Sequence, residues 1–152
     1  MFKILISDKL AEEGVKILKE VPEFQVDIKT DFTPETLKSA IKDYDALIVR
    51  SSILVTPEII HAADKLKFIG RAGVGLDNVD LEAATKKGII AMNTPAGNTS
   101  STAEHTMSMI LALSRNIPQA YSSMKAGKWD RSKFNGVELY GKTLGVVGFG
   151  RI

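Results

Sequence analysis

The sequence predicts an α/β fold built on a parallel sheet, followed by the start of a second α/β domain. Residues 1–98 alternate short apolar runs with helical patterns, which is the order of elements found around parallel sheets. From residue 143 onward, another apolar run leads into Gly148-Phe-Gly150, the beginning of a glycine-rich turn. A hydrophobic content of 44% beside 25% charged residues indicates an ordinary globular protein that can bury a core.

Five apolar runs in the first part predict strands. They cover Lys3–Ser7, Phe24–Lys29, Ala46–Arg50, Lys67–Arg71 and Ile89–Met92. Five strands with helices between them predict a flavodoxin-like layered domain, and ligands of such sheets gather at the carboxyl ends of the strands.

Capping residues mark where the helices begin. Thr33-Pro34-Glu35 and Thr56-Pro57-Glu58 each combine a hydroxyl cap, a proline at the first helical position and an acid facing the helix dipole. Asp80 is expected to cap a helix over Leu81–Lys87, and Gly88 to end it.

A long helical stretch follows Asn98, and the domain boundary is expected there. Its apolar positions fit a buried or interfacial face, and Pro118 should interrupt it near 115–117. The helix should resume to Ala126 and stop at Gly127, and a strand is expected over Lys142–Val147. We therefore divide the chain into a substrate-side domain, 1–98, and a linking helix with the truncated start of a second domain, 99–152.

Charge and composition exclude several classes of function. Residues 1–98 carry 13 Lys and Arg against 15 Asp and Glu, whereas residues 99–152 carry 7 against 3, so the second part is the better meeting place for an anion. The lysines form no basic stripe with stacking aromatics, which argues against nucleic acid. With no run of about 18 apolar residues and no leader pattern, we expect a cytoplasmic protein without membrane partners. The absence of cysteine excludes disulfides, thiolate metal ligands and a cysteine nucleophile.

The end of the sequence, Thr143-Leu-Gly-Val-Val-Gly148-Phe-Gly150-Arg-Ile152, is the first part of a dinucleotide-binding fingerprint. Glycines between a buried strand and a helix let backbone N–H groups reach a pyrophosphate, which points to NAD or a related cofactor. Alone, the pattern is also compatible with an ordinary tight turn. The third glycine would be residue 153, and the acid that holds the ribose would come about 20 residues later, so most of the cofactor domain is expected to be absent.

Five strings taken in order resemble the D-isomer-specific 2-hydroxyacid dehydrogenases, and within them the branch that acts on 3-phosphoglycerate. The resemblance covers essentially the whole chain and rests on Leu47-Ile-Val-Arg-Ser-Ser52, Gly70-Arg-Ala-Gly-Val-Gly-Leu-Asp-Asn-Val-Asp80, Met92-Asn-Thr-Pro-Ala-Gly-Asn98, Gly127-Lys-Trp-Asp-Arg131 and Gly141-Lys-Thr-Leu-Gly-Val-Val-Gly-Phe-Gly-Arg-Ile152.

The resemblance implies that Arg50, with Ser51 beside it, holds the substrate. A guanidinium fork at a strand end matches a carboxylate or phosphate in bidentate geometry. The alternative is an arginine that snorkels at the strand end or pairs with Asp45.

Arg71 and Val74 lie in the turn after the next strand, which the family uses to line the cleft facing nicotinamide. Gly73 and Gly75 bracket Val74 and permit close backbone approach. A plain strand-to-helix turn, with Arg71 paired to Asp77, is the alternative.

Two further substrate contacts are implied in the second part. The Asn98 amide can donate to and accept from a hydroxy acid, although helix capping would also explain it. Arg131 resembles an arginine that reaches the substrate phosphate of a neighbouring subunit, and a surface salt bridge to Asp130 is its alternative. Gly148, Gly150, Arg151 and Ile152 are implied as the turn that binds the cofactor pyrophosphate.

No catalytic residue or metal ligand is expected here. His61 falls in a short polar helix, and the adjacent Glu104 and His105 point about 100° apart on a helix and form no acid–base pair. In the family the catalytic arginine, glutamate and histidine come later in sequence, beyond Ile152.

The resemblance implies that the parent protein is an NAD-dependent oxidoreductase that converts 3-phosphoglycerate to 3-phosphohydroxypyruvate in serine biosynthesis. It also implies a homo-oligomer, of which this chain supplies the substrate side without activity of its own. Another D-2-hydroxyacid as substrate, a catalytically dead remnant and a stand-alone flavodoxin-like binding module are the alternatives. A phosphoryl-receiver module is disfavoured because Arg50 stands where the phosphorylated aspartate would be.

Overall fold

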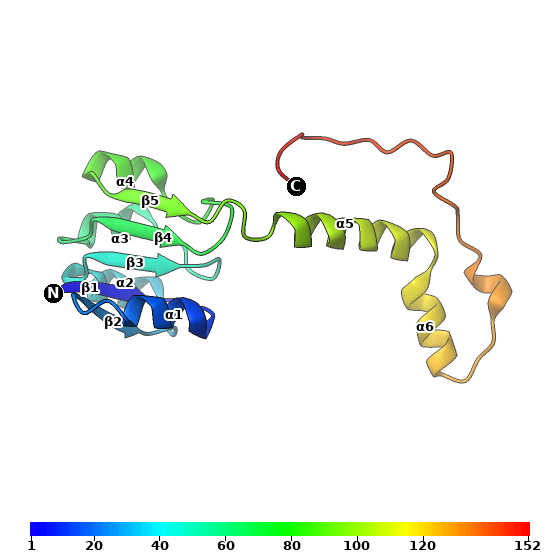
Figure 1. Ribbon diagram of the computed structural model, residues 1–152, viewed down its shortest axis with the longest axis horizontal. Helices are drawn as coiled ribbons and strands as arrows, with labels where there is room; N and C mark the ends of the chain where they lie inside the picture. Colours follow the sequence, from blue (N-terminus) through cyan, green and yellow to red (C-terminus); the bar gives the residue numbers. More distant parts are fainter. The chain divides into compact units, whose positions relative to one another are not determined.

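Five parallel strands form the sheet that the sequence predicts. The computed structural model describes residues 1–152, which make two compact units, Met1–Gly97 and Asn98–Ile152. In the first unit the strands run in the order β2-β1-β3-β4-β5 (Figure 1). They are β1 (Phe2–Ile6), β2 (Phe24–Ile28), β3 (Ala46–Val49), β4 (Phe68–Arg71) and β5 (Ile90–Asn93), so every strand lies within one residue of its expected place. The α/β fold class is therefore confirmed.

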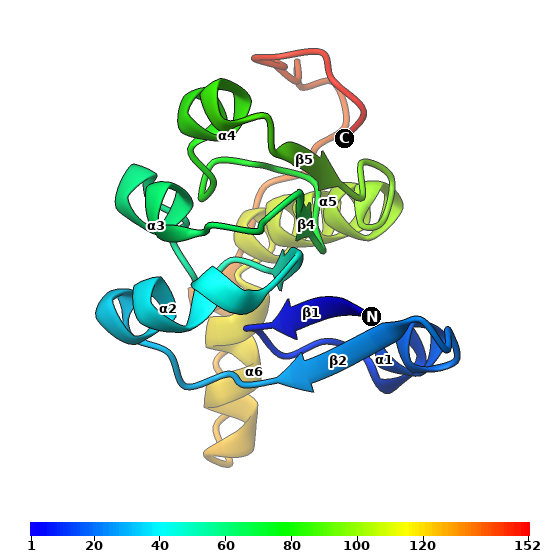
Figure 2. The same cartoon turned by 90° about the vertical axis from the view of Figure 1, so that its left-hand side faces the viewer.

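Four helices and one 3₁₀ turn connect the strands. They are α1 (Glu12–Lys19), α2 (Pro34–Ala40), η1 (Ile41–Asp43), α3 (Pro57–Ala62) and α4 (Leu81–Lys87). Helices α2, α3 and α4 lie on one side of the sheet and α1 on the other (Figure 2).

The expected caps are present in two of three helices. The Thr33 hydroxyl accepts a bond from the Thr36 N–H, and the Asp80 carboxylate accepts one from the Ala83 N–H at 2.8 Å. Gly88 ends α4 in the left-handed conformation, with φ of 73°. Thr56 stands at the start of α3 but its hydroxyl makes no capping bond, so this helix begins with only its proline and its acid.

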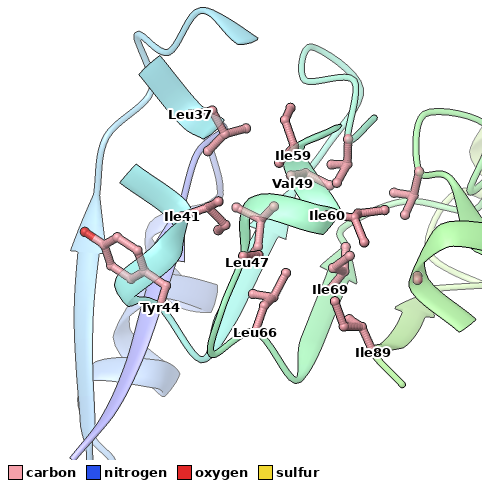
Figure 3. Packing of buried hydrophobic residues seen from close by; sticks show 14 of the residues in the cluster. Leu37, Ile41, Tyr44, Leu47, Val49, Ile59, Ile60, Leu66, Ile69 and Ile89 are labelled. Atoms are coloured by element: carbon pink, nitrogen blue, oxygen red, sulfur yellow. The ribbon is translucent and has the colours of Figure 1, made fainter. Parts of the chain in front are cut away.

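The main core lies between the sheet and the α2–α3–α4 layer. Parallel register places Leu5 beside Leu47 and Leu47 beside Ile69, and all three are fully buried. Side chains of the helices, among them Leu37 and Ile60, close over this row (Figure 3). Each such side chain contributes about 1.5–3 kcal/mol on burial, so this face carries most of the stability of the unit.

The opposite face of the sheet is covered only in part. Helix α1 packs Val15 and Leu18 with Ile4 and Ile6 of β1. At the β4–β5 side the same face ends in Ile90 and Met92, which remain 52% and 53% exposed, respectively. A parallel sheet normally buries both faces, so this part of the first unit shows apolar surface.

The second unit consists of α5 (Thr99–Ser114), α6 (Ile117–Lys125) and the 3₁₀ turn η2 (Arg131–Phe134). The interruption predicted from Pro118 is confirmed: Asn116 adopts a left-handed φ of 53° between the two helices. Neither helix has a buried residue. No helix of the chain is both long enough and apolar enough to cross a membrane.

The strand expected over Lys142–Val147 is not formed: these residues pair with no other strand. A strand is held by hydrogen bonds to a neighbour. Residues 98–152 contain no second apolar run placed to pair with it, so the sequence pattern alone is insufficient here.

Candidate functional site

The predicted substrate residues of the first unit lie at the carboxyl ends of β3 and β4. The parallel register places Val49 directly beside Arg71, so the segments after these two residues leave the sheet as neighbours. Asp8 follows β1, the other neighbour of β3, and Asn93 ends β5, the other neighbour of β4. The site is thus assembled from four parallel strand ends, where ligands of such sheets bind.

The loop after β3 is held by side chains from two distant segments. Asp8 accepts hydrogen bonds from the N–H groups of Arg50 and Ser52, at 2.8 and 3.3 Å, and from the Ser52 hydroxyl. Asn78 donates to the carbonyls of Arg50 and Ile53, both at 2.7 Å. Both N–H groups and carbonyls of residues 50–53 are therefore bonded to side chains from other segments.

The Arg50 guanidinium is exposed and forms no ion pair. Its one hydrogen bond is a long contact of 3.4 Å from Nη1 to the Lys9 carbonyl. The alternative partner, Asp45, stands at the other end of β3 and instead pairs with Lys67 at 3.8 Å. The fork of Arg50 is consequently free to bind an anion.

Asp8 is almost fully buried, and its pKa is nevertheless lowered. Burial acts to raise the pKa of this carboxyl, but the Ser52 hydroxyl and the N–H groups of Arg50 and Ser52 outweigh it by hydrogen bonding, with a further contribution from the Arg50 charge. Asp8 is therefore a carboxylate whose charge is taken up by neighbouring donors.

Arg71 lies folded against the turn that follows it. The space that a side chain at Gly73 would need is filled by the Arg71 guanidinium, and the corresponding space at Gly75 is filled by the Asp77 carboxylate. Arg71 forms no ion pair with Asp77 or any other acid, and its buried Nε has no partner. A buried, unpaired donor at a strand end is a place where an anionic ligand can complete the bonding.

Val74 is half-buried, and its backbone is fixed by Asn93. The Asn93 amide donates to the Val74 carbonyl at 2.6 Å, which ties the turn after β4 to the end of β5. The two glycines beside Val74 thus lie in a turn whose shape is set by side chains around it rather than in a free loop.

The candidate residues of the second unit are exposed. Asn98 starts α5 through its carbonyl, which accepts from the Thr102 N–H at 2.9 Å, but its side chain makes no capping bond. The alternative for Arg131 is also not formed, because Asp130 pairs with Lys133 at 3.1 Å. Both side chains are left free for another ligand.

The glycine-rich turn near the end of the sequence is exposed. Gly148 adopts a φ of 92°, which favours glycine, and the space beside Gly145, Gly148 and Gly150 is open. Arg151 and Ile152 are exposed. An open glycine-rich turn of this kind allows backbone N–H groups to approach a phosphate.

Both histidines lie outside the four strand ends that form the site. His61 and His105 are exposed. No three His, Cys, Asp or Glu side chains come together as metal ligands.

A cavity of about 620 Å³ lies between α1 and the ends of β1 and β2, beside the candidate site. Asp8 borders it, but Arg50 and Arg71 do not. Its floor is apolar, and the polar atoms of Asp8 are already bonded, so the candidate site is placed at the arginines.

Three residues of the site, Asp8, Asn78 and Asn93, were absent from the predicted set. The signal that could have found Asp8 is its position directly after the first strand, since carboxyl ends of parallel strands meet at one edge. Asn78 and Asn93 lie within strings that carry the family resemblance, but only the tertiary fold shows that their amides face the backbone of neighbouring loops.

Comparison with known proteins identifies close similarity along the whole chain. The family described as "D-isomer specific 2-hydroxyacid dehydrogenase, catalytic domain" matches residues 4–143. The chain is 57% identical over 152 residues to D-3-phosphoglycerate dehydrogenase of Methanocaldococcus jannaschii, covering 100% of this chain and 29% of that protein. It is 55% identical over 150 residues to the human D-3-phosphoglycerate dehydrogenase, covering 99% of this chain and 28% of that protein.

Among solved structures, D-lactate dehydrogenase from Aquifex aeolicus in complex with NAD and lactic acid is similar with a TM-score of 0.83. It is 29% identical, and the match covers 98% of this chain and 45% of the other. The chain therefore spans under a third of these two curated relatives and under half of this structure.

Proposed function

The chain belongs to the D-isomer specific 2-hydroxyacid dehydrogenases, and from this membership we propose that the whole protein oxidises 3-phosphoglycerate to 3-phosphohydroxypyruvate with NAD. This reaction is the first step of serine biosynthesis. The identity of 57% to a relative named D-3-phosphoglycerate dehydrogenase supports this choice of substrate over another D-2-hydroxyacid.

The observation that carries the proposal is the pair of arginines at adjacent strand ends. Arg50 and Arg71 lack acidic partners, and together they offer two positive forks on neighbouring loops. A substrate that carries both a carboxylate and a phosphate needs more than one such group, and guanidinium binds either anion in bidentate geometry. Ser51 and the Asn98 amide supply further donors, and Arg131 would reach the substrate phosphate of a neighbouring subunit. We assign these five residues to substrate binding.

The cofactor assignment is supported by the turn at Gly148. Bound NAD supplies the acceptor for the hydride that leaves the alcohol carbon. Gly148, Gly150, Arg151 and Ile152 would hold its pyrophosphate, and Val74 would line the nicotinamide side of the cleft.

The carboxylate beside Arg50, Asp8, is already bonded to Arg50 and Ser52 and is not available as a general base. We expect the 152 residues alone to bind substrate anions weakly and to catalyse nothing.

We further propose that the protein is a cytoplasmic homo-oligomer. The apolar side chains that α5 and α6 leave exposed favour association between copies. A reaction that consumes NAD also requires the nicotinamide pool inside the cell.

The decisive test is the exchange Arg50→Lys in the full-length enzyme. Lysine keeps the charge but loses the fork, so the KM for 3-phosphoglycerate should rise about tenfold or more while the affinity for NAD stays unchanged. Arg115→Lys, at an exposed arginine outside the candidate set, is the matched control. An unchanged KM would remove Arg50 from the site, and faster turnover of D-lactate than of 3-phosphoglycerate would favour the other substrate class.

A second test uses the 152-residue chain itself. Few contacts to the cofactor are present, so calorimetric titration with NAD should show no binding below millimolar concentration. Tight binding or measurable oxidation of 3-phosphoglycerate by this chain would contradict the proposal that it supplies only the substrate side.

A further inference from the structure

Two buried polar side chains, Asp8 and Asn78, hold the loop that carries Arg50. Each is only 8% exposed. Asp8 pairs with the N–H groups of Arg50 and Ser52, whereas Asn78 pairs with the carbonyls of Arg50 and Ile53. Four backbone groups of one short loop are thus bonded to side chains 25 to 44 residues away in sequence.

The loop needs this support because β3 has already ended. Val49 is its last residue, and the Val49 carbonyl still accepts a hydrogen bond from the Ala72 N–H at 2.9 Å. Beyond Val49 the sheet no longer fixes the chain, and the side-chain bonds of Asp8 and Asn78 take over. Buried backbone groups without partners would cost stability, so these bonds select one loop conformation.

The two side chains fix the backbone but leave the ligand-facing groups free. Ser51 is exposed and makes no hydrogen bond within the chain, and the Arg50 guanidinium has only its long contact to Lys9. If Asp8 and Asn78 served only to stabilise the fold, the loop between them would not need to carry an exposed, unpaired arginine and serine.

The negative charge of Asp8 is compatible with a neighbouring anion site because the carboxylate oxygens already accept hydrogen bonds. A free carboxylate beside Arg50 would repel an anionic ligand and would compete for the guanidinium. Here the carboxylate accepts three hydrogen bonds from Arg50 and Ser52, and its lowered pKa agrees with a stabilised charge.

We propose that Asp8 and Asn78 are positioning residues of the substrate site, which act through residues 50–53 to aim the Arg50 guanidinium at the anionic group of the substrate. This inference rests on the proposed function for the identity of the anion. The hydrogen bonds that it invokes can be tested without any substrate.

The first experiment measures amide hydrogen exchange in the 152-residue chain. Asn78→Asp keeps the shape of the side chain but replaces the group that donates both hydrogen bonds with an acceptor, whereas Asp8→Ala removes both accepting oxygens. Loss of these part-buried hydrogen bonds should speed exchange at Arg50 and Ser52 about tenfold or more. Exchange at Ile69, in the core, reports whether the variant is folded, and Asp64→Asn, at an exposed aspartate with no bonding partner, is the control.

If Asn78→Asp does not fold, Ser52→Ala gives a milder version of the same experiment. It removes only the hydroxyl that donates to Asp8, and Ser52→Thr should restore the protection because it keeps the hydroxyl. This rescue separates hydrogen bonding from a general loss of packing.

The second experiment measures kinetics of the full-length enzyme. Removing the Asp8 charge by itself would favour an anionic substrate, so a rise in the KM reports the loss of positioning. Asp8→Ala should raise the KM for 3-phosphoglycerate about tenfold, with a much smaller change in kcat and none in NAD affinity. The Asp64→Asn control should change none of the three.

The outcomes separate the two proposals. Faster exchange at Arg50 together with a raised KM supports the positioning role. Unchanged exchange in a folded variant, or faster exchange with an unchanged KM, overturns it. An unmodified enzyme that does not oxidise 3-phosphoglycerate would overturn the proposed function, while the exchange result would still decide whether Asp8 and Asn78 hold the loop.

Discussion

The two units of the chain use apolar residues in opposite ways. In Met1–Gly97 the strands and helices bury a continuous core, whereas α5 and α6 of Asn98–Ile152 contain no buried residue. Side chains such as Leu47 and Leu113 are chemically identical, yet the first is fully buried and the second is 77% exposed.

This difference shows which parts of folding are local. Pro118 and the left-handed Asn116 separate α5 from α6, and the left-handed Gly127 follows the end of α6, without a core to pack on. Burial, in contrast, requires a second layer of structure, and residues 98–152 supply only one. The second unit therefore forms its helices but does not bury their apolar side chains.

The largest effect that tests this comparison is the exchange of leucine for alanine in each unit. Leu47→Ala should lower the free energy of unfolding by about 2–5 kcal/mol, because it leaves a cavity in the core. Leu113→Ala should change it by less than about 0.5 kcal/mol. Urea denaturation followed by circular dichroism measures both, and equal losses would mean that the second unit packs in solution.

A second test concerns association of the chain. The exposed face of α5 carries Met107 and Leu111 one turn apart, each 47% exposed. Replacing both with lysine should weaken self-association at least about tenfold, which corresponds to 1.4 kcal/mol. Light scattering at tens of micromolar gives the mass, with Ser108→Lys on the same helix as control. If the unmodified chain is strictly monomeric, this face of α5 does not mediate self-association.

A smaller effect is expected at Lys87 of α4, whose ammonium group binds the carboxyl end of α3. Lys87 donates to the carbonyls of Ile60, His61 and Ala63 at the end of α3, at 2.7 to 2.8 Å. The Ile60 carbonyl also accepts from the Ala63 N–H. Lys87→Met should reduce stability by about 1 kcal/mol, because the stem is kept and the donors are lost. Lys86→Met is the control, since Lys86 only pairs with exposed Glu82 and should matter by a few tenths. Equal effects in thermal denaturation would contradict this.

The smallest effect is a pH dependence located in the first unit. The pKa of Asp8 is lowered from its ordinary 3.8 in the folded chain, so its contribution to stability is present above that pH and is lost as the pH falls through the folded value. Asp8→Asn should flatten the acid side of the stability curve, measured by urea denaturation from pH 6 to 2. Asp64→Asn should leave the curve as it is, and a curve unchanged by Asp8→Asn would contradict the assignment.

The sequence predicted nearly all of the regular structure in the first unit. Short runs such as Leu47-Ile-Val49 are apolar on both faces and predict central strands. Asp80 and Gly88 mark the two ends of α4 by local hydrogen bonding and backbone conformation. The strand over Lys142–Val147 failed for the opposite reason, since its existence depends on a neighbour. The sequence pattern thus predicts a strand correctly where the neighbouring strands also lie in the chain, as they do in the first unit.

For the site, the sequence indicated the arginines but not the residues that hold them. Arg50 and Arg71 follow recognisable strands, so their place at a carboxyl edge could be inferred. The bond from Arg50 to Asp8 depends on β1 lying beside β3, and the bonds from Asn78 and Asn93 depend on loops that meet only in the folded sheet. Spacing along the chain does not contain this adjacency.

The bonds from Asp8, Asn78 and Asn93 also bear on how substrate preference can evolve. All three reach the backbone of the loops and none reaches the Ser51 or Val74 side chains, so those positions can change identity while the loop path is conserved. Relatives with other substrates could then differ at the ligand-facing positions and keep the frame around them. Because these hydrogen bonds hold the loop backbone whatever the ligand-facing side chain is, a mutation at such a position can alter substrate selectivity with little loss of stability.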